Sequence, residues 1–110
     1  MRLHSSSAAA VLVMLGAASV SAQSSSRIAA EGGDIVITPI MHSSAQVEHA
    51  GVVIQVDPWS VGDLSAAKSA DLILITDDPG HHLDPEAIAQ LRKPGAPVVL
   101  TATAHARFSD

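Results

Sequence analysis

The chain has no cysteine and no tyrosine, and it has only one tryptophan and one phenylalanine among its 110 residues. The absence of cysteine excludes disulfide bonds as a means of stabilising a small fold. Because aromatic side chains are so scarce, the hydrophobic core must be built from Val, Ile, Leu and Ala. A single domain of this size buries a modest core, and we expect its stability to be marginal.

Positive charge is also scarce. Six Lys and Arg stand against eleven Asp and Glu, which gives a net charge of −5 with neutral histidines. The sequence contains no basic cluster of the kind that binds nucleic acids or anionic membrane surfaces. We therefore expect no nucleic acid as a partner, and the composition leaves a small-molecule substrate open.

The first 22 residues have the pattern of a secretory signal peptide. Arg2 supplies a positive start, residues 8–18 form an apolar stretch, and residues 20–22 offer small side chains at a cleavage site. The stretch is shorter than the roughly 20 residues that span a bilayer, and no cysteine follows it, which disfavours a lipoprotein. We expect export to the periplasm or medium, a mature chain from Gln23 and no membrane association after cleavage. The alternative is a buried N-terminal helix.

Residues 23–33 are polar and rich in Ser and Gly, which predicts a flexible lead-in to one domain at residues 34–110. Residues 33–40 then form a β-type run that contains three isoleucines and a proline near its end. Residues 45–56 contain two further β-type runs, separated at Gly51. This pattern predicts a hairpin with a short turn near residues 49–51.

Residues 71–76 (DLILIT) are a continuous apolar run, which predicts a strand buried on both faces. A helix should follow, with Asp84 as its N-cap, Pro85 at its first position and its end before Pro94. Residues 96–103 predict a further strand. A strand, a helix and a strand within about 30 residues form a βαβ unit with parallel strands, so the fold class is α/β.

The loop between the first of these strands and the helix contains Asp77, Asp78, His81 and His82. In parallel α/β sheets, ligands bind at the carboxyl ends of strands, where loops lead into helices. Zinc and similar divalent metals favour imidazole and carboxylate ligands, so the loop is a candidate metal site. The alternative is a polar turn with a surface histidine pair, because Asp-Asp-Pro-Gly is a good turn sequence without any ligand.

Three stretches of the chain resemble the N-terminal half of the metallo-β-lactamase superfamily: GDIVITPIMHSS, GVVIQVDP and ADLILITDDPGHHLDPEAIAQLRKPGAPVVL. They are most similar to the branch of small metal-dependent hydrolases that includes ascorbate-phosphate lactonase-like proteins. The family motif is Thr-His-x-His-x-Asp-His, followed by Leu-Asp and a helix. Thr76 and His82 match its first and last positions. The residues at the three ligand positions between them differ from the motif: Asp77, Pro79 and His81.

The resemblance implies the N-terminal part of an αββα sandwich and a metal-dependent hydrolase of an ester, lactone or phosphoester. In that case Asp77, His81 and His82 would bind zinc or another divalent metal, and Asp78 would orient a water molecule or act as the general base. Pro79 has no donor atom, so the motif is degenerate. The alternatives are a non-catalytic binding or scaffold domain and an inactive, truncated remnant.

Four further residues have a weaker connection to this site. His42 matches a histidine that is frequent in this branch, and His105 follows the last predicted strand and could replace a lost ligand. Asp57 either ends a strand or supports the site, and His49 is expected to be exposed in the hairpin. The family's second half supplies more ligands and covers the sheet's apolar inner face. We therefore expect a fragment, or a homodimer that completes the sandwich.

Overall fold

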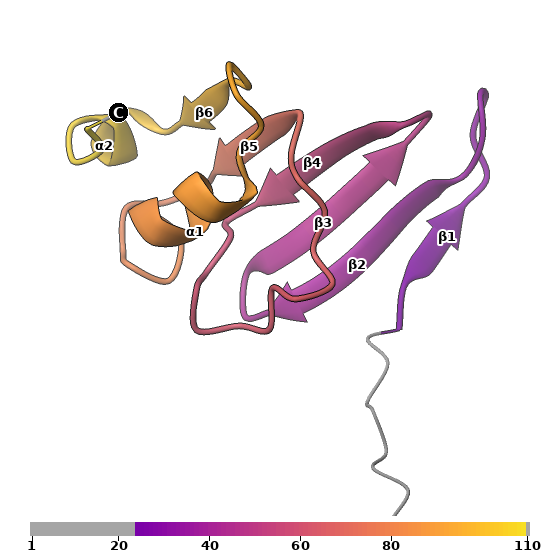
Figure 1. The fold of residues 1–110 in the computed structure, drawn as a ribbon, viewed down its shortest axis with the longest axis horizontal. Helices are drawn as coiled ribbons and strands as arrows, with labels where there is room; N and C mark the ends of the chain where they lie inside the picture. Colours follow the sequence, from indigo (N-terminus) through magenta and orange to yellow (C-terminus); the bar gives the residue numbers. More distant parts are fainter. Residues whose placement is uncertain (1–23, 110) are drawn as a thin grey trace, which may run out of the picture.

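The computed structural model describes residues 24–109, which form one six-stranded mixed sheet with two short helices (Figure 1). The strands lie side by side in chain order, from β1 to β6. Their bounds, with those of the helices, are β1 Ser26–Ile28, β2 Ile35–Met41, β3 Ser44–His49, β4 Val52–Val56, β5 Leu72–Ile75, α1 Pro85–Leu91, β6 Val98–Leu100 and α2 Ala102–His105.

Strands β1 to β4 pair antiparallel, and β4, β5 and β6 pair parallel. The predicted hairpin is confirmed as β3 and β4, whose turn contains Ala50 at φ 48° and Gly51 at φ 83°. Two consecutive residues with positive φ give a turn whose twist matches that of the flanking strands, which is why glycine is favoured there. The predicted parallel βαβ unit is confirmed as β5, α1 and β6.

Helix α1 begins as the sequence predicts. The side chain of Asp84 accepts hydrogen bonds from the backbone N–H groups of Glu86 and Ala87, and Pro85 is the first helical residue. The helix ends at Leu91, and its buried residues Ala87, Ile88 and Leu91 form the face that packs on the sheet.

Two predicted boundaries were wrong. Part of the predicted flexible lead-in is strand β1, which pairs with β2 through its backbone although its side chains are exposed. The predicted last strand is shorter than residues 96–103. It ends at Leu100 because Thr101 caps helix α2, with its side-chain oxygen accepting from the N–H of Ala104.

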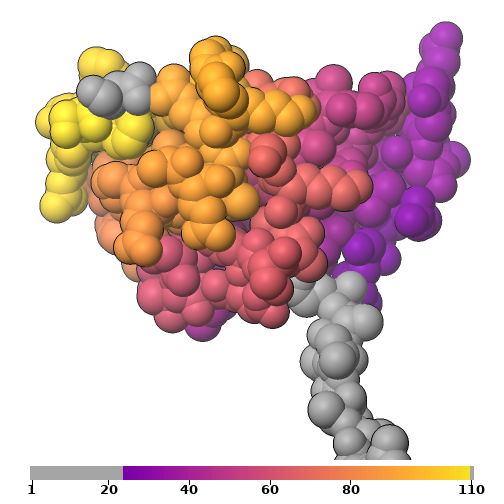
Figure 2. Space-filling view, viewed as in Figure 1, coloured from indigo at the N-terminus to yellow at the C-terminus, as the bar shows by residue number. Residues whose placement is uncertain are grey.

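Helix α1 and the segment of residues 58–70 cover one face of the sheet, which is the face turned toward the viewer in Figures 1 and 2. Two hydrophobic clusters lie beneath them. The first joins Ile73, Ile75, Leu83, Ile88 and Ala104 with Ala70, and the second joins Leu64, Ala87 and Leu91. The core is therefore aliphatic, as the composition predicts.

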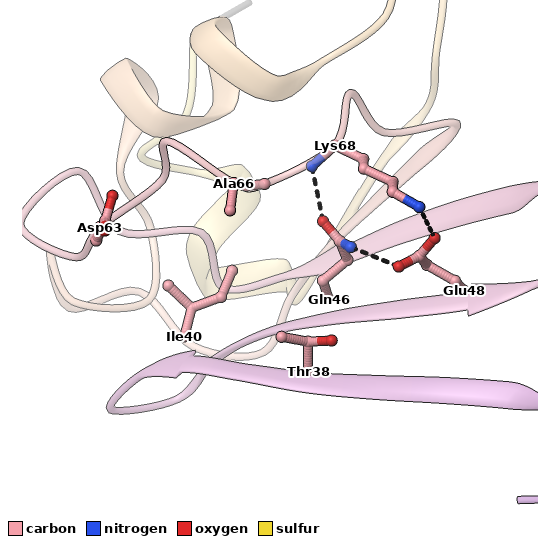
Figure 3. Close-up of a pocket in the computed structure, with 8 residues that line it drawn as sticks. Thr38, Ile40, Gln46, Glu48, Asp63, Ala66 and Lys68 are labelled. Atoms are coloured by element: carbon pink, nitrogen blue, oxygen red, sulfur yellow. Dashed lines mark hydrogen bonds and ion pairs between the residues drawn. The ribbon is translucent and has the colours of Figure 1, made fainter. Parts of the chain in front are cut away.

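A partly buried polar network attaches the segment 58–70 to the middle of the sheet (Figure 3). The side-chain oxygen of Gln46 accepts from the amide of Gln55 at 2.8 Å and from the backbone N–H of Lys68 at 2.7 Å. The ammonium of Lys68 pairs with Glu48 and lowers the pKa of that carboxyl. A cavity of about 160 Å³ lies between this network, Thr38 and Ile40, and no histidine lines it.

The opposite face of the sheet is apolar and is not covered by either helix. The pairing register places Ile54 beside Leu72 and Val56 beside Leu74, on the side away from the buried Ile73. All four side chains are only half-buried. The prediction that residues 71–76 are buried on both faces is therefore wrong for the described residues. These residues contain no second sheet, so the sandwich stays a prediction.

The predicted signal peptide, residues 1–22, lies outside the described residues. Between residues 24 and 109, none of the helices is long and apolar enough to cross a membrane.

Candidate functional site

Strands β2, β4 and β5 all run in the same direction and end at one edge of the sheet. His42 follows β2, Asp57 follows β4 and Thr76 follows β5. The loop of residues 77–84 leads from the same edge into α1. Three segments that are distant in the sequence therefore contribute side chains to one place, which is the edge where ligands bind in sheets of this kind.

Asp57 organises this edge. Its side chain is 1 % exposed, and its backbone has a φ of 43°, which is uncommon for a residue other than glycine. Its carboxylate accepts hydrogen bonds from the backbone N–H of Thr76 at 2.8 Å and from the Thr76 hydroxyl at 2.5 Å. It also lies 2.7 Å from Nδ1 of His82. These three contacts satisfy a buried charge and fix the neighbours around it.

The contact with Asp57 defines the tautomer of His82. A carboxylate only accepts hydrogen bonds, so Nδ1 carries a proton, and in the neutral imidazole Nε2 carries the lone pair. A histidine that binds a metal generally donates its other ring N–H to a carboxylate or carbonyl group in this way, which orients the ring and raises its basicity. His82 is thus held as a metal ligand would be.

The loop itself is held by backbone contacts. The carbonyl oxygen of Pro79 accepts from the N–H groups of His82 and Leu83, both at 2.8 Å, and Leu83 is buried in the core. Asp84 accepts from the backbone N–H of Ser60 at 2.8 Å and from its hydroxyl at 2.7 Å. Partial burial opposes ionisation of Asp84, but the hydrogen bonds from Ser60 and the helix N-terminus outweigh it and lower the pKa.

Three histidine rings gather beside Asp57, and we call them the imidazole cluster: His42, His81 and His82. The ring centroid of His81 lies 4.6 Å from that of His42 and 4.5 Å from that of His82. The ring centroids of His42 and His82 are 6.1 Å apart. His42 has a φ of 55°, and a strained backbone of this kind occurs preferentially at functional sites. The hydroxyl of Ser43 donates to the carbonyl of His81 at 3.3 Å, which joins the two segments.

The two aspartates of the loop, Asp77 and Asp78, form their hydrogen bond and ion pair with residues outside the imidazole cluster. The carboxylate of Asp77 accepts from the N–H of Asp78 at 2.9 Å. The carboxylate of Asp78 forms an ion pair with Arg107 at 2.7 Å, and the Arg107 guanidinium lowers the pKa of that carboxyl. A lower pKa makes Asp78 a weaker proton acceptor while the pair is intact. The roles predicted for Asp77 and Asp78 stay predictions.

Two histidines lie elsewhere. His49 is half-buried rather than exposed, and its Nε2 lies 2.9 Å from the carbonyl oxygen of Glu31. His105 is exposed at the end of α2.

The chemistry of the donors fits a divalent metal, although the rings do not yet surround one point. Among residues 24–109, no three His, Asp or Glu side chains are arranged to hold a metal ion as they stand. Three imidazoles, one of them oriented by a buried carboxylate, are a donor set that zinc accepts. His42 is exposed and His81 is half-buried.

Sequence reasoning missed one neighbour of the cluster and understated another. Trp59 contacts His42 and His81 edge-on, with ring centroids 6.2 and 6.3 Å apart. Nothing in the sequence pattern indicates this contact, because it depends on how residues 58–70 turn back. For Asp57, the available signal was its position directly after a strand at the same edge as the loop.

A comparison with known structures finds a protein of similar fold. The chain is similar to a protein from Parabacteroides distasonis described as a "putative metal-dependent hydrolase", with 31% identity and a TM-score of 0.72. The match covers 78% of this chain and 40% of the other, so the chain spans about two fifths of the length of that protein. No protein-family model and no curated protein matches the chain.

Proposed function

We propose that the chain carries the metal-binding half of a metal-dependent hydrolase of the metallo-β-lactamase superfamily. The observation that carries this proposal is the buried Asp57 carboxylate on Nδ1 of His82, which leaves Nε2 available beside two further imidazoles. The similarity to the hydrolase from Parabacteroides distasonis supports it. The motif resemblance at Thr76 and His82 supports the choice of superfamily.

The side chains at this edge of the sheet would have separate roles in metal binding and hydrolysis. The imidazole cluster would hold the ion, with His82 binding through Nε2 and Asp57 keeping its ring oriented. When bound, zinc or another divalent metal supplies Lewis acidity for the hydrolysis of an ester, lactone or phosphoester. Asp77 is the predicted additional oxygen ligand. Asp78 is the predicted base or water-positioning group, a role for which it must exchange its contact with Arg107 for one with water.

The second candidate is a binding domain that has kept the fold without the chemistry. Two observations favour it: Pro79 occupies a ligand position of the motif, and Asp78 is paired with Arg107. Such a domain would still bind a small molecule at the same edge of the sheet, but it would not hydrolyse it.

A hydrolysis assay in the presence of zinc distinguishes the metal-dependent hydrolase from the binding domain. The purified chain is incubated with zinc and with an aryl ester, a lactone and an aryl phosphodiester. We expect turnover that EDTA removes, that His82→Ala abolishes and that His49→Ala retains, since His49 is the matched histidine away from the cluster. Equal rates for the chain, both variants and the zinc-containing buffer would contradict the hydrolase and favour the binding domain.

We also propose that the protein is exported. The charged start, short apolar stretch and small residues at 20–22 support this proposal. The test is the mass of the chain recovered from the periplasm or medium of an expressing bacterium. A product that starts at Gln23 is the expected result, and an unprocessed chain confined to the cytoplasm would contradict it.

A further inference from the structure

The face of the sheet that neither helix covers is apolar from one edge to the other, and we call it the uncovered face. Its residues follow from the pairing register, which aligns two rows of side chains across the strands. The first row is Ile37, Val47, Ile54 and Leu72, and the second is Ala45, Val56, Leu74 and Val99. Ile35 and Ile28 continue the face at the β1 edge. None of these side chains is buried by the described residues.

The same strands are well covered on their other side. Gln55 and Ile73, which alternate with the residues of the first row, are both 0% exposed. Thr38 and Glu48 point into the cavity on that side of the sheet (Figure 3). Successive side chains of a strand point to opposite faces. The exposure of the uncovered face therefore results from a missing layer and not from loosely packed strands.

The pairing of the strands makes a second layer necessary. Strands β4, β5 and β6 pair parallel. Parallel strands occur almost only in sheets with both faces covered, because their side chains are apolar on both sides. Val56, Leu74 and Val99 lie in this parallel part of the sheet and show that pattern, with Val99 53% exposed. We therefore expect a partner that covers this face.

The distribution of charge favours a second copy of the chain as that partner. Each copy has a net charge of −5, so two copies repel each other in most orientations. The strands contain only two charged residues, Arg27 and Glu48, and both lie on the covered face, in register with Val36. Contact through the uncovered faces brings no charged strand residue into the interface.

The area of the uncovered face is sufficient for a dimer. Six strands about 4.8 Å apart, each about five residues long with a rise of about 3.3 Å per residue, cover roughly 400 Å² in flat projection. The relief of the side chains adds to this area. Two such faces together bury on the order of 1,000 Å², which is the size that a specific protein interface requires.

We propose that the uncovered face binds the same face of a second copy, so that two sheets pack face to face in a homodimer. The interface is isologous, because each copy contributes the same residues around a two-fold axis. The strand directions of the two sheets differ by about 30°, as the twist of each sheet requires. This inference uses no residue of the imidazole cluster and does not depend on metal binding.

The mass of the purified chain in solution tests the proposal. Size exclusion with light scattering should give twice the mass of one chain, which is 11.2 kDa. The mass should stay at that value when the protein concentration is raised tenfold, because a closed two-fold interface leaves no apolar face free for a third copy.

Three lysine variants locate the interface. Val47→Lys, in the middle of the first row, should give the mass of one chain with an unchanged circular dichroism spectrum. Val99→Lys, at an exposed position on the edge strand, should raise the dissociation constant of the dimer at least tenfold. Val36→Lys is the matched control, because Val36 is a half-buried valine on the covered face, where the new lysine lies opposite Glu48. It should remain a dimer.

Four outcomes would overturn the proposal. The first is a monomer of the unmodified chain. The second is a mass that grows without limit as the concentration is raised, which would mean non-specific aggregation. The third is a dimer that Val36→Lys weakens as much as Val99→Lys does. The fourth is a monomeric full chain and a dimeric chain that begins at Gln23, since the apolar residues 8–18 would then be the segment that covers the face.

Discussion

The carboxylate of Asp57 lies 2.7 Å from Nδ1 of His82, although 25 residues separate the two in the chain. The contact joins the end of β4 to the loop before α1, across the end of β5. It leaves one nitrogen of a nearly buried imidazole available at the edge of the sheet where two more imidazoles lie. The proposed metal chemistry depends on this relationship more than on any other.

Replacement of Asp57 by alanine should destabilise the fold. It removes the common acceptor of three hydrogen bonds and leaves the N–H of Thr76 and Nδ1 of His82 without their partner, at a cost of roughly 2–4 kcal/mol. Urea unfolding measures the change. Asp63→Ala, at an exposed acid, is the control and should change stability by less than about 0.5 kcal/mol.

Asp57→Asn tests the orienting role in a protein that stays folded. The amide keeps the size of the carboxylate but is a poorer acceptor for His82, so zinc affinity should fall about 10- to 100-fold. Competition with a chromogenic chelator gives the affinity. Zinc affinity equal to that of the unmodified chain would mean that Asp57 has only a structural role.

The hydrogen bonds from Ser60 to Asp84 predict a pH dependence of stability. Because the folded pKa of Asp84 is lowered, its carboxylate stabilises the fold fully above its unfolded pKa of about 4. This contribution is lost as the pH falls through the folded pKa. Asp84→Asn should therefore lose less stability than the unmodified chain between about pH 5 and 2, measured by urea unfolding. Asp34→Asn, at an exposed acid directly before β2, should follow the unmodified chain. Parallel curves for all three proteins would exclude the contribution of Asp84.

The uncovered apolar face predicts self-association of the purified chain. Ile54, Val56, Leu72 and Leu74 form a stripe across two central strands, and a second copy would remove it from water. Light scattering after size exclusion should give a mass above that of one chain. Ile54→Lys should lower that mass, whereas Val61→Lys, at an exposed position in the segment 58–70 on the other face, should not. A chain that is monomeric without either substitution would contradict a homodimer.

Local sequence signals predicted most of the fold. Asp84 and Pro85 mark the start of α1, and Gly51 marks the hairpin, because capping and positive φ are properties of single residues. Strand β1 escaped prediction because its pairing with β2 uses only the backbone. The last strand was predicted too long because Val98 to Thr103 is a β-type run. The strand ends at Leu100, because Thr101 is the N-cap of α2.

The candidate site was predicted less completely. Sequence position placed His81 and His82 in one loop at the correct edge of the sheet. It did not indicate that Asp78 pairs with Arg107 or that His42 lies against His81, since both contacts depend on how distant segments meet. The resemblance to the family motif predicts His82 as a metal ligand, and the structure adds the Asp57 carboxylate that orients its ring.

Zinc content of the purified chain, measured by mass spectrometry, tests the central claim most directly. The unmodified chain and His49→Ala should each retain about one zinc per chain or per pair of chains after dialysis, and His82→Ala should retain none. Equal zinc content in all three proteins, or none in any of them, would contradict a metal centre at the imidazole cluster.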